Sequence, residues 1–213
     1  MSALPGMKIK PTKIICVGLN YRDHAKELNM AIPKEPIIFL KPPSALIFNG
    51  DHIVYPPQTR ELHYEAELAV VISQRGKNIP AEKAGEYIAG YTCANDVTAR
   101  DLQRQDGQWT RAKSFDTFCA IGPAVVPLPS ADNLEVKLLL NGEVKQCSNT
   151  SQLIFNVNHL ISFISGIMTL EKDDLVLTGT PLGVGPMEKG DSVEVRIEKI
   201  GSHINTVKGA EGR

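Results

Sequence analysis

Two glutamates separated by one residue stand in a stretch that otherwise has the composition of a buried strand. Residues 63–72 end in the run Leu68-Ala69-Val70-Val71-Ile72, which is apolar on both faces. In an extended chain alternate side chains share a face, so we expect Glu65 and Glu67 to point to the same place. Two desolvated carboxylates in contact must share a proton or bind a cation. An ordinary amphipathic strand with a solvated acidic face is the alternative that this spacing leaves open.

A third carboxylate, Asp96, follows residues 90–95, which we expect to form the next strand. Asp96 could be a helix N-cap, but Thr98 and Asp101 resemble a capping box more closely for a predicted helix over residues 99–105. Asp96 is then free to join the two glutamates. Three carboxylates are hard oxygen ligands, which favour Mg²⁺, Mn²⁺ or Ca²⁺ over Zn²⁺ and leave coordination positions for water and substrate.

A histidine and a glutamate three residues apart form a second candidate for chemistry. His24 and Glu27 fall on a predicted helix over residues 21 to about 30, with Asn20 as its expected N-cap. Side chains at this spacing can touch. A carboxylate bonded to one imidazole nitrogen fixes the tautomer and makes the other nitrogen a better base, which suits activation of water. An ordinary solvated helix face is the alternative reading of the same residues.

Polar residues after Asp96 could hold an acidic substrate. Arg100 and Gln103 lie one helical turn apart, where a guanidinium and an amide could bind a carboxylate brought to the metal. An exposed helical arginine is the alternative. Further along, Lys113 lies in residues 109–116, between small and aromatic side chains.

A glycine-rich turn over residues 178–186 follows the apolar run Leu175-Val176-Leu177. It lacks the Gly-Lys-Ser/Thr ending of a phosphate-binding loop and does not lead into a predicted helix, so we reject a nucleotide site here. Close approach of the turn's backbone to a small ligand is left open.

The composition favours a small-molecule partner. The chain has 213 residues, 42% of them apolar, which is enough for one large domain or two small ones, and we expect one. The net charge of -1, from 23 basic and 24 acidic residues, indicates neither a nucleic-acid-binding patch nor an acidic tail. No apolar run approaches the roughly 20 residues needed to span a bilayer, so we expect no membrane partner.

The cysteines and the amino terminus favour a cytoplasmic location. The first eight residues lack the apolar core of a secretion signal. The four cysteines form no C-x-x-C pair, and Cys16, Cys93 and Cys119 lie in apolar contexts. They are therefore expected to be small buried hydrophobes in a reducing compartment, without a chemical role.

The remaining pattern is mostly β. Short apolar segments are separated by Pro42-Pro43, Asn49-Gly50 and Pro56-Pro57. Strands are expected over residues 13–17, 37–40, 45–48, 53–55, 120–126, 134–140, 143–145, 192–197 and 203–207. Asn141-Gly142 predicts a tight hairpin. Short helices are expected over residues 80–86 and 157 to about 168, the latter with Asn156 as a possible cap.

Five motifs in order then resemble the fumarylacetoacetate hydrolase superfamily. They are Val17-Gly18-Leu19-Asn20-Tyr21-x-x-His24-x-x-Glu27, Glu65-x-Glu67, Asn95-Asp96-Val97-Thr98-Ala99-Arg100-Asp101-x-Gln103, Ala112-Lys113-Ser114-Phe115-Asp116 and Thr178-Gly179-Thr180-Pro181-x-Gly183-Val184-Gly185. The chain is most similar to the short single-domain members with acylpyruvate hydrolase or oxaloacetate decarboxylase activity. The amino-terminal domain of the full-length hydrolase is missing, so fumarylacetoacetate itself is not the expected substrate.

The resemblance implies an α+β fold, a β-rich mixed-sheet roll of the fumarylacetoacetate hydrolase C-terminal-domain type with a few short helices. It implies one catalytic domain over residues 1–213, with residues 1–12 as an N-terminal extension, and a homodimer. The implied ligands of a Mg²⁺ or Mn²⁺ ion are Glu65, Glu67 and Asp96. The implied catalytic residues are His24 and Glu27, which activate water, and Lys113, which supports the developing enolate. The implied substrate-binding residues, for the carboxylate and keto oxygen, are Arg100, Gln103 and Thr180.

Three functions are compatible with these residues. The first is metal-dependent hydrolysis of a C–C bond in a 3-acylpyruvate, which gives pyruvate and a carboxylic acid. The second keeps the same metal and enolate but needs no attacking water: decarboxylation of oxaloacetate, or enol–keto tautomerisation or isomerisation of related 2-keto dicarboxylates. The third is a non-catalytic module that binds 2-keto acids, for which the three carboxylates alone would suffice. His24 discriminates between the first two, since only hydrolysis should require it absolutely.

Overall fold

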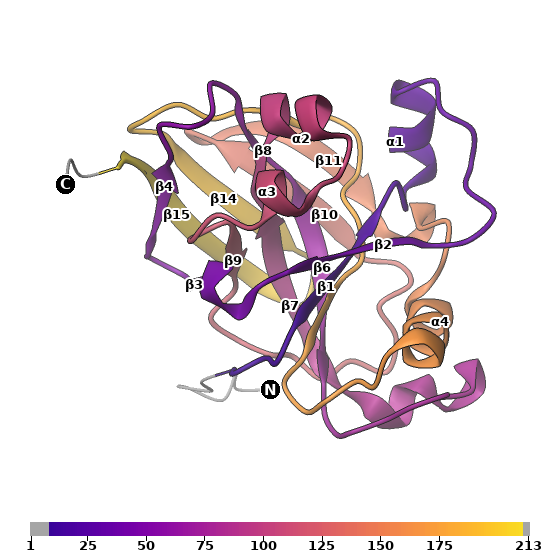
Figure 1. Ribbon diagram of the computed structural model, residues 1–213. Helices are drawn as coiled ribbons and strands as arrows, with labels where there is room; N and C mark the ends of the chain where they lie inside the picture. The colour runs from indigo at the N-terminus through magenta and orange to yellow at the C-terminus, as the bar shows by residue number, and fades with distance from the viewer. Residues whose placement is uncertain (1–8, 211–213) are drawn as a thin grey trace.

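A computed structural model of the chain describes residues 9–210 (Figure 1). Over these residues the strands form three sheets, of seven, five and three strands. The largest contains β1 (Ile14–Gly18), β2 (Ile37–Lys41), β3 (Leu46–Phe48), β6 (Ala66–Ile72), β7 (Ile88–Asp96), β9 (Cys119–Ile121) and β12 (Leu175–Leu177), in the order β2-β1-β12-β6-β7-β9-β3. The second contains β4 (His52–Tyr55), β10 (Glu135–Leu140), β11 (Glu143–Asn149), β14 (Ser192–Ile197) and β15 (Gly201–Gly209), in the order β11-β10-β14-β15-β4. The smallest contains β5 (Leu62–Tyr64), β8 (Thr98–Ala99) and β13 (Gly185–Pro186), in the order β13-β5-β8.

Parallel and antiparallel pairs occur in the same sheets. β1 runs parallel to β12 and antiparallel to β2, and β15 runs parallel to β4 and antiparallel to β14. The helices are short: α1 (Arg22–Glu27), α2 (Arg100–Asp106), α3 (Thr110–Lys113) and α4 (Val157–Ile167), with 3-10 turns η1 (Pro43–Ala45), η2 (Ala81–Tyr87) and η3 (Thr150–Gln152). In Figure 1, α1, α2 and α3 lie toward the upper edge, whereas α4 lies below them. The predicted α+β, β-rich mixed-sheet fold with a few short helices is confirmed.

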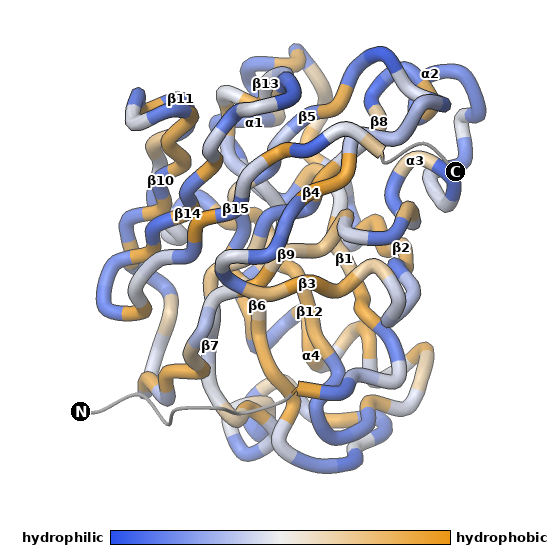
Figure 2. Tube along the Cα trace, turned by 90° about the vertical axis from the view of Figure 1, so that its left-hand side faces the viewer, coloured by the Kyte–Doolittle hydropathy of each residue, from blue (hydrophilic) through white to orange (hydrophobic). Residues whose placement is uncertain are grey.

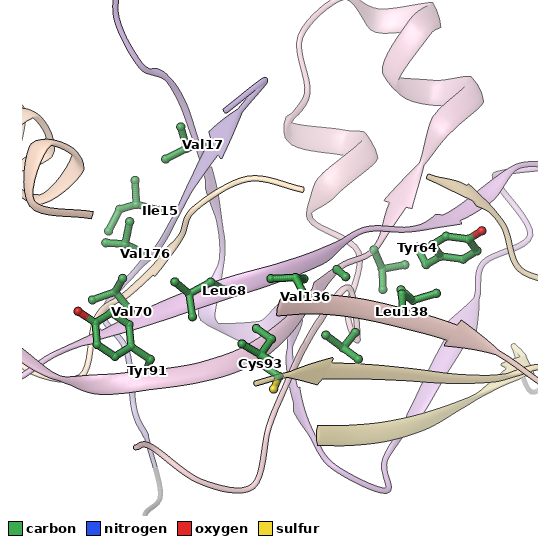
Figure 3. Close-up of a cluster of buried hydrophobic side chains, with 14 of the residues drawn as sticks. Ile15, Val17, Tyr64, Leu68, Val70, Tyr91, Cys93, Val136, Leu138 and Val176 are labelled. Atoms are coloured by element: carbon green, nitrogen blue, oxygen red, sulfur yellow. The ribbon is translucent and has the colours of Figure 1, made fainter. Parts of the chain in front are cut away.

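Strand β6 is buried on both faces, which explains its uninterrupted apolar run. Leu68 and Val70 belong to the larger core cluster, which also contains Val136 and Leu138 of β10 in the five-stranded sheet (Figure 3). Val71, on the alternate face, belongs to a second and smaller cluster. The hydrophobic colouring of β6 and β12 in Figure 2 follows this burial. The carboxylates that precede this run are therefore attached to a strand that is buried along its whole length.

The prediction of one continuous strand over residues 63–72 is wrong. The chain breaks at Glu65 into β5, which pairs with β8 and β13, and β6, which pairs with β7 and β12. The break is held by two hydrogen bonds: the Glu65 N–H donates to Asn95 Oδ1 (2.9 Å), and the Asp96 N–H donates to the Glu65 carbonyl (2.9 Å). This break places Glu65 at the junction of β5 and β6, directly beside Asn95 and Asp96 at the end of β7.

The predicted cap of the His24 helix is also wrong. Helix α1 begins after Tyr21 without a side-chain cap and ends at Glu27, before the expected residue 30. The buried Asn20 side chain instead donates to the carbonyls of Phe155 and Thr178 and accepts the Phe155 N–H.

The predicted capping box fails for a similar reason. The Thr98 hydroxyl donates to the Asp96 carbonyl (2.9 Å), and the Asp101 carboxylate accepts hydrogen bonds from the Thr59 hydroxyl and the Arg60 N–H. Helix α2 therefore begins after Ala99 without a side-chain cap. Distant partners thus take Asn20 and Asp101 from the predicted caps, whereas Thr98 bonds to a neighbouring carbonyl in the chain.

Other local predictions are confirmed. Asn156 caps α4, its Oδ1 accepting from the His159 N–H (2.9 Å), and Asn141-Gly142 forms the β10–β11 turn with φ of 52° and 82°. Cys16, Cys93 and Cys119 are buried and form no disulfide bond. The expected N-terminal extension lies mostly outside the described residues, and its described part packs against the protein, with Ile9 in the smaller core cluster. None of the helices within residues 9–210 combines the length and apolarity that crossing a membrane would need.

Candidate functional site

Three buried carboxylates from separate positions in the chain converge. Glu65 at the β5–β6 junction, Glu67 on β6 and Asp96 at the end of β7 each offer an oxygen, and these oxygens all lie within 4.8 Å of one another. Antiparallel pairing of β6 with β7 places Ala66 opposite Asn95, which brings the flanking acids together. Each of the three acids is less than 10% exposed. Their burial rules out an ordinary solvated acidic face.

Two cations neutralise part of this charge. Lys113 Nζ lies 2.9 Å from Glu65 Oε2 and 2.7 Å from Asp96 Oδ2. Arg100 forms an ion pair with Glu65 and donates to Gln103 Oε1 (2.6 Å). Burial alone would raise the pKa of Glu65, but Lys113 and Arg100 outweigh it and hold that pKa well below its usual value. Glu65 is therefore a carboxylate at any working pH.

Glu67 is in the opposite situation. Its Oε2 accepts the Gly179 N–H (2.6 Å). Burial, and after it the negative charges of Asp96 and Glu65, raise the pKa of Glu67 well above its usual value, although Lys113 partly opposes this. A carboxylate in that environment must take up a proton or a cation. Three hard oxygen donors, one of them electrostatically unsatisfied, fit a divalent ion such as Mg²⁺ or Mn²⁺.

Lys113 is a permanent cation in this site. Burial tends to lower the pKa of its ammonium group, but Asp96 and Glu65 more than compensate and raise that pKa to about 12. Its Nζ also lies 5.1 Å from the centre of the Phe39 ring. The ammonium therefore borders both the carboxylates and an aromatic wall.

A second buried lysine, Lys41, was not anticipated from the sequence. Its Nζ lies 2.6 Å from Asp96 Oδ1 and donates to the backbone carbonyls of Val97 (3.1 Å) and Lys113 (2.5 Å). Lys41 ends the apolar strand β2, immediately before Pro42. A charged residue that ends an apolar strand is a weak signal in the sequence, and it gave no indication of the partner.

The His24–Glu27 pair forms as expected. His24 Nδ1 lies 2.8 Å from Glu27 Oε2, and His24 is buried. Glu27 Oε1 also accepts the Gly183 N–H (3.0 Å), and Asp23 bonds to the Ser148 hydroxyl of β11. Helix α1 is thus attached to the glycine-rich turn and to the five-stranded sheet. A neutral imidazole with its proton on Nδ1 would leave Nε2 as the basic nitrogen.

The glycine-rich turn brings Thr180 to the site. The buried Thr180 hydroxyl accepts the Gln146 Nε2–H (3.0 Å). Gly179 and Gly183 have φ of 104° and 88°, and a Cβ at Gly183 would come within 2.5 Å of the Lys145 carbonyl oxygen. These glycines therefore let the turn donate backbone N–H groups to Glu67 and Glu27. The sequence had left open an approach of this backbone to a small ligand, which stays a prediction.

One cavity of about 320 Å³ collects these side chains. Of the nine residues assigned roles from the sequence, all except Glu27 line it: His24, Glu65, Glu67, Asp96, Arg100, Gln103, Lys113 and Thr180. Glu27 reaches it through His24. His24, three carboxylates and the cations Arg100, Arg104 and Lys113 thus border one small space. Such a space is suited to an acidic molecule of a few carbon atoms.

Comparison with known proteins agrees with this arrangement. A family model described as the C-terminal region of fumarylacetoacetate (FAA) hydrolase matches residues 13–208. A mitochondrial oxaloacetate tautomerase of Bos taurus is 48% identical over 210 residues, covering 93% of this chain and 67% of the relative.

Solved structures of the same kind superimpose closely. A 5-carboxymethyl-2-hydroxymuconate delta-isomerase from Mycobacterium smegmatis has a TM-score of 0.90 at 45% identity, covering 96% of this chain and 81% of the other. A fumarylpyruvate hydrolase from Pseudomonas aeruginosa, in complex with Mn²⁺ and pyruvate, has a TM-score of 0.90 at 32% identity, covering 99% and 97%. With its mixed-sheet fold and its matched residues, the chain belongs to the fumarylacetoacetate hydrolase family.

Proposed function

We propose that this protein is a divalent-metal-dependent enzyme that hydrolyses a C–C bond in 3-acylpyruvates, giving pyruvate and a carboxylic acid. The observation that carries the proposal is that the hydrogen-bonded His24–Glu27 pair borders the same cavity as the carboxylates Glu65, Glu67 and Asp96. The three carboxylates alone would account for binding of a metal and a keto acid. The imidazole that Glu27 orients beside them adds a proton acceptor, which catalysis needs and binding does not. A solved relative named as a fumarylpyruvate hydrolase supports this reaction class.

The three carboxylates would hold Mg²⁺ or Mn²⁺. The raised pKa of Glu67 supports the fit, because a bound cation would relieve the repulsion that raises it. When bound, the ion would supply Lewis acidity to the oxygens at the 2-keto acid end of the substrate. The Mn²⁺ of the Pseudomonas aeruginosa relative supports a metal of this class.

The protein's own groups then have distinct tasks. His24, oriented through Nδ1 by Glu27, would accept a proton from a water molecule that attacks the distal carbonyl carbon. The bond between that carbon and C3 of the pyruvate fragment breaks, and its electron pair stays on the fragment. Lys113, a buried and permanent cation, would stabilise this negative charge. Return of the proton from His24 to C3 completes pyruvate, and the water oxygen leaves in the carboxylic acid.

Substrate orientation falls to three further residues. Arg100 and Gln103, already joined at 2.6 Å, would bind the substrate carboxylate, and the Thr180 hydroxyl would bind the keto oxygen. Gln146 holds Thr180 in place through its amide. We further propose that the chain works as one catalytic domain, as a homodimer and in the cytoplasm.

The direct test is pyruvate release from acetylpyruvate, followed by coupling to lactate dehydrogenase. We expect release with added Mg²⁺ or Mn²⁺ and its loss when EDTA is in excess. Pyruvate release no faster than in a protein-free control with either metal would refute the proposal. Oligomeric state is checked by light scattering on a sizing column, where a monomer would refute the homodimer.

A second function is supported by the 48% identity to a protein named as an oxaloacetate tautomerase. Decarboxylation or tautomerisation of oxaloacetate would use the same carboxylates and Lys113 but no attacking water. Comparing His24→Ala on acetylpyruvate and on oxaloacetate separates the two, after subtraction of the metal-catalysed background. Hydrolysis should fall by about 10²-fold or more, while the oxaloacetate reaction should persist. Turnover of any 2-keto acid would eliminate the non-catalytic binding module.

A further inference from the structure

The wall of the cavity beyond the charged residues is apolar. It is formed by Leu19, Leu28, Met30, Ile37, Phe39 and Trp109. Leu28, Met30 and Ile37 are 47%, 53% and 43% exposed, which is high for large apolar side chains beside a polar site. Exposure of this apolar group to water is unfavourable, whereas contact with an apolar part of a ligand would bury it.

Trp109 occupies a place that the rest of the chain leaves free for it. A Cβ at Gly18 would lie 2.6 Å from Cζ3 of the indole, so the ring fits only because residue 18 is glycine. The indole packs edge-to-face on Phe39 with ring centres 5.2 Å apart. Phe39 in turn lies beside the Lys113 ammonium. Phe39 and Trp109 therefore line the cavity next to Lys113, beyond the place where the pyruvate end of a substrate would bind.

Leu19 is held in this wall against its backbone preference. Its φ of 48° lies in the left-handed region, which leucine rarely adopts. The buried Asn20 side chain supports the turn by donating to the carbonyls of Thr178 (2.7 Å) and Phe155 (3.0 Å) and accepting the Phe155 N–H (2.8 Å). Strain that is supported in this way places an apolar side chain in the cavity.

Two cations of the cavity, Arg100 and Lys113, lie at the keto-acid end, where the proposed function assigns them to the first carboxylate and to the developing negative charge. Arg100 binds Glu65 and Gln103, and Lys113 binds Glu65 and Asp96. Arg104 is the third lysine or arginine that lines the cavity, and its guanidinium lies 2.6 Å from Glu61 Oε2. A second carboxylate at the far end of a substrate would therefore meet mainly apolar groups. Its one cationic neighbour, Arg104, is 60% exposed and already paired with Glu61, so this carboxylate would lose hydration for only a weak, solvent-screened partner.

We propose that the substrate is a 2-keto acid whose distal group is uncharged and apolar, and that Trp109 determines this specificity together with Phe39 and Leu19. The inference rests on the proposed function for the keto-acid end of the cavity. It agrees with hydrolysis of an uncharged 3-acylpyruvate and argues against oxaloacetate as the preferred substrate. It separates this chain from a dicarboxylate-specific enzyme.

Trp109 provides its own probe, because it is the only tryptophan of the 213 residues. Mg²⁺-loaded protein is titrated with pyruvate, 2-oxopentanoate and 2-oxooctanoate, and with 2-oxoglutarate as a dicarboxylate, while tryptophan emission is recorded. Each fully buried methylene can strengthen binding by up to about fourfold. We expect the dissociation constant to fall along the monocarboxylate series, and 2-oxoglutarate to bind at least about tenfold more weakly than 2-oxopentanoate.

Variants locate the effect, with calorimetry replacing fluorescence where Trp109 is changed. In Trp109→Ala the ratio of the pyruvate and 2-oxooctanoate dissociation constants should collapse towards one, whereas Trp109→Phe should retain most of it. Gly18→Ala, which displaces the indole, should also reduce the ratio. Phe48→Ala removes an exposed ring outside the cavity and should leave the ratio unchanged.

Three outcomes would overturn the inference. Equal affinity for all monocarboxylates would overturn it and leave the keto-acid site intact. Tighter binding of 2-oxoglutarate, abolished by Arg104→Gln, would show a cationic distal site instead. A complete lack of binding by every 2-oxo acid would overturn both this inference and the proposed function.

Discussion

Lys41 Nζ lies 2.6 Å from Asp96 Oδ1, and both side chains are almost completely buried. Asp96 therefore contacts two lysines, since Lys113 approaches its other oxygen at 2.7 Å. Lys41 does not line the cavity, so its contribution is to hold Asp96 and the Lys113 backbone from behind.

Lys41→Met should destabilise the protein by about 3–5 kcal/mol, because it leaves a buried carboxylate with one cation fewer and frees two buried carbonyls. Urea unfolding followed by circular dichroism measures this. Lys137→Met is the matched control, as Lys137 pairs with Glu135 on the surface and should change stability little. Equal effects of the two substitutions would show that the buried Lys41–Asp96 pair stabilises the protein no more than a surface pair does.

Glu67→Gln should have opposite effects in metal-free and metal-loaded protein. Glu67 has a raised pKa, so its native state binds more protons than the unfolded state above about pH 4.5, and stability falls as pH rises through that window. A neutral glutamine removes this penalty, so the metal-free variant should be at least as stable as wild type at neutral pH. Saturating Mn²⁺ at about 100 times its dissociation constant should stabilise wild type by about 2.7 kcal/mol and the variant much less. Equal stabilisation of both by Mn²⁺, in thermal unfolding, would remove Glu67 from the ligand set.

Gly183→Ala should reduce hydrolysis while sparing the metal site. The new Cβ would lie 2.5 Å from the Lys145 carbonyl oxygen at a φ of 88°, so the turn must shift and its N–H would leave Glu27. Looser orientation of His24 should lower kcat by about tenfold or more, with Mn²⁺ affinity retained. Gly190→Ala is the control, since its φ is 99° but its Cβ would meet open space. If both variants lose activity equally, backbone strain alone explains the loss.

His203 should make the protein sensitive to acid. Burial lowers the pKa of this imidazole to about 4, although Glu194 partly opposes the shift. The unfolded state then binds more protons below about pH 6.5, so the contribution is complete above that pH and is lost as pH falls towards 4. Going from pH 7 to about pH 5 should cost wild type about 2 kcal/mol more than His203→Gln. The exposed His52→Gln is the control, and an identical acid response in all three proteins would refute the assignment.

Local patterns in the sequence determined much of this protein. The apolar run of β6 predicts a strand buried on both faces, Asn156 caps its helix, and Asn141-Gly142 forms a hairpin. The motifs are specific enough to indicate the family. These features depend on backbone preferences and on side-chain alternation between chain neighbours, which the sequence records directly.

Only the tertiary structure decided which partner each buried polar group takes. The partners of Lys41 lie 56 and 72 residues away, and the Gly183 amide lies 156 residues from Glu27. Asn20 and Asp101 had acceptable local partners in the predicted caps, yet Asn20 bonds to Thr178 and Asp101 to Thr59. A desolvated polar group must be satisfied by whatever packing brings near it, and that choice depends on the whole fold, not on neighbouring residues.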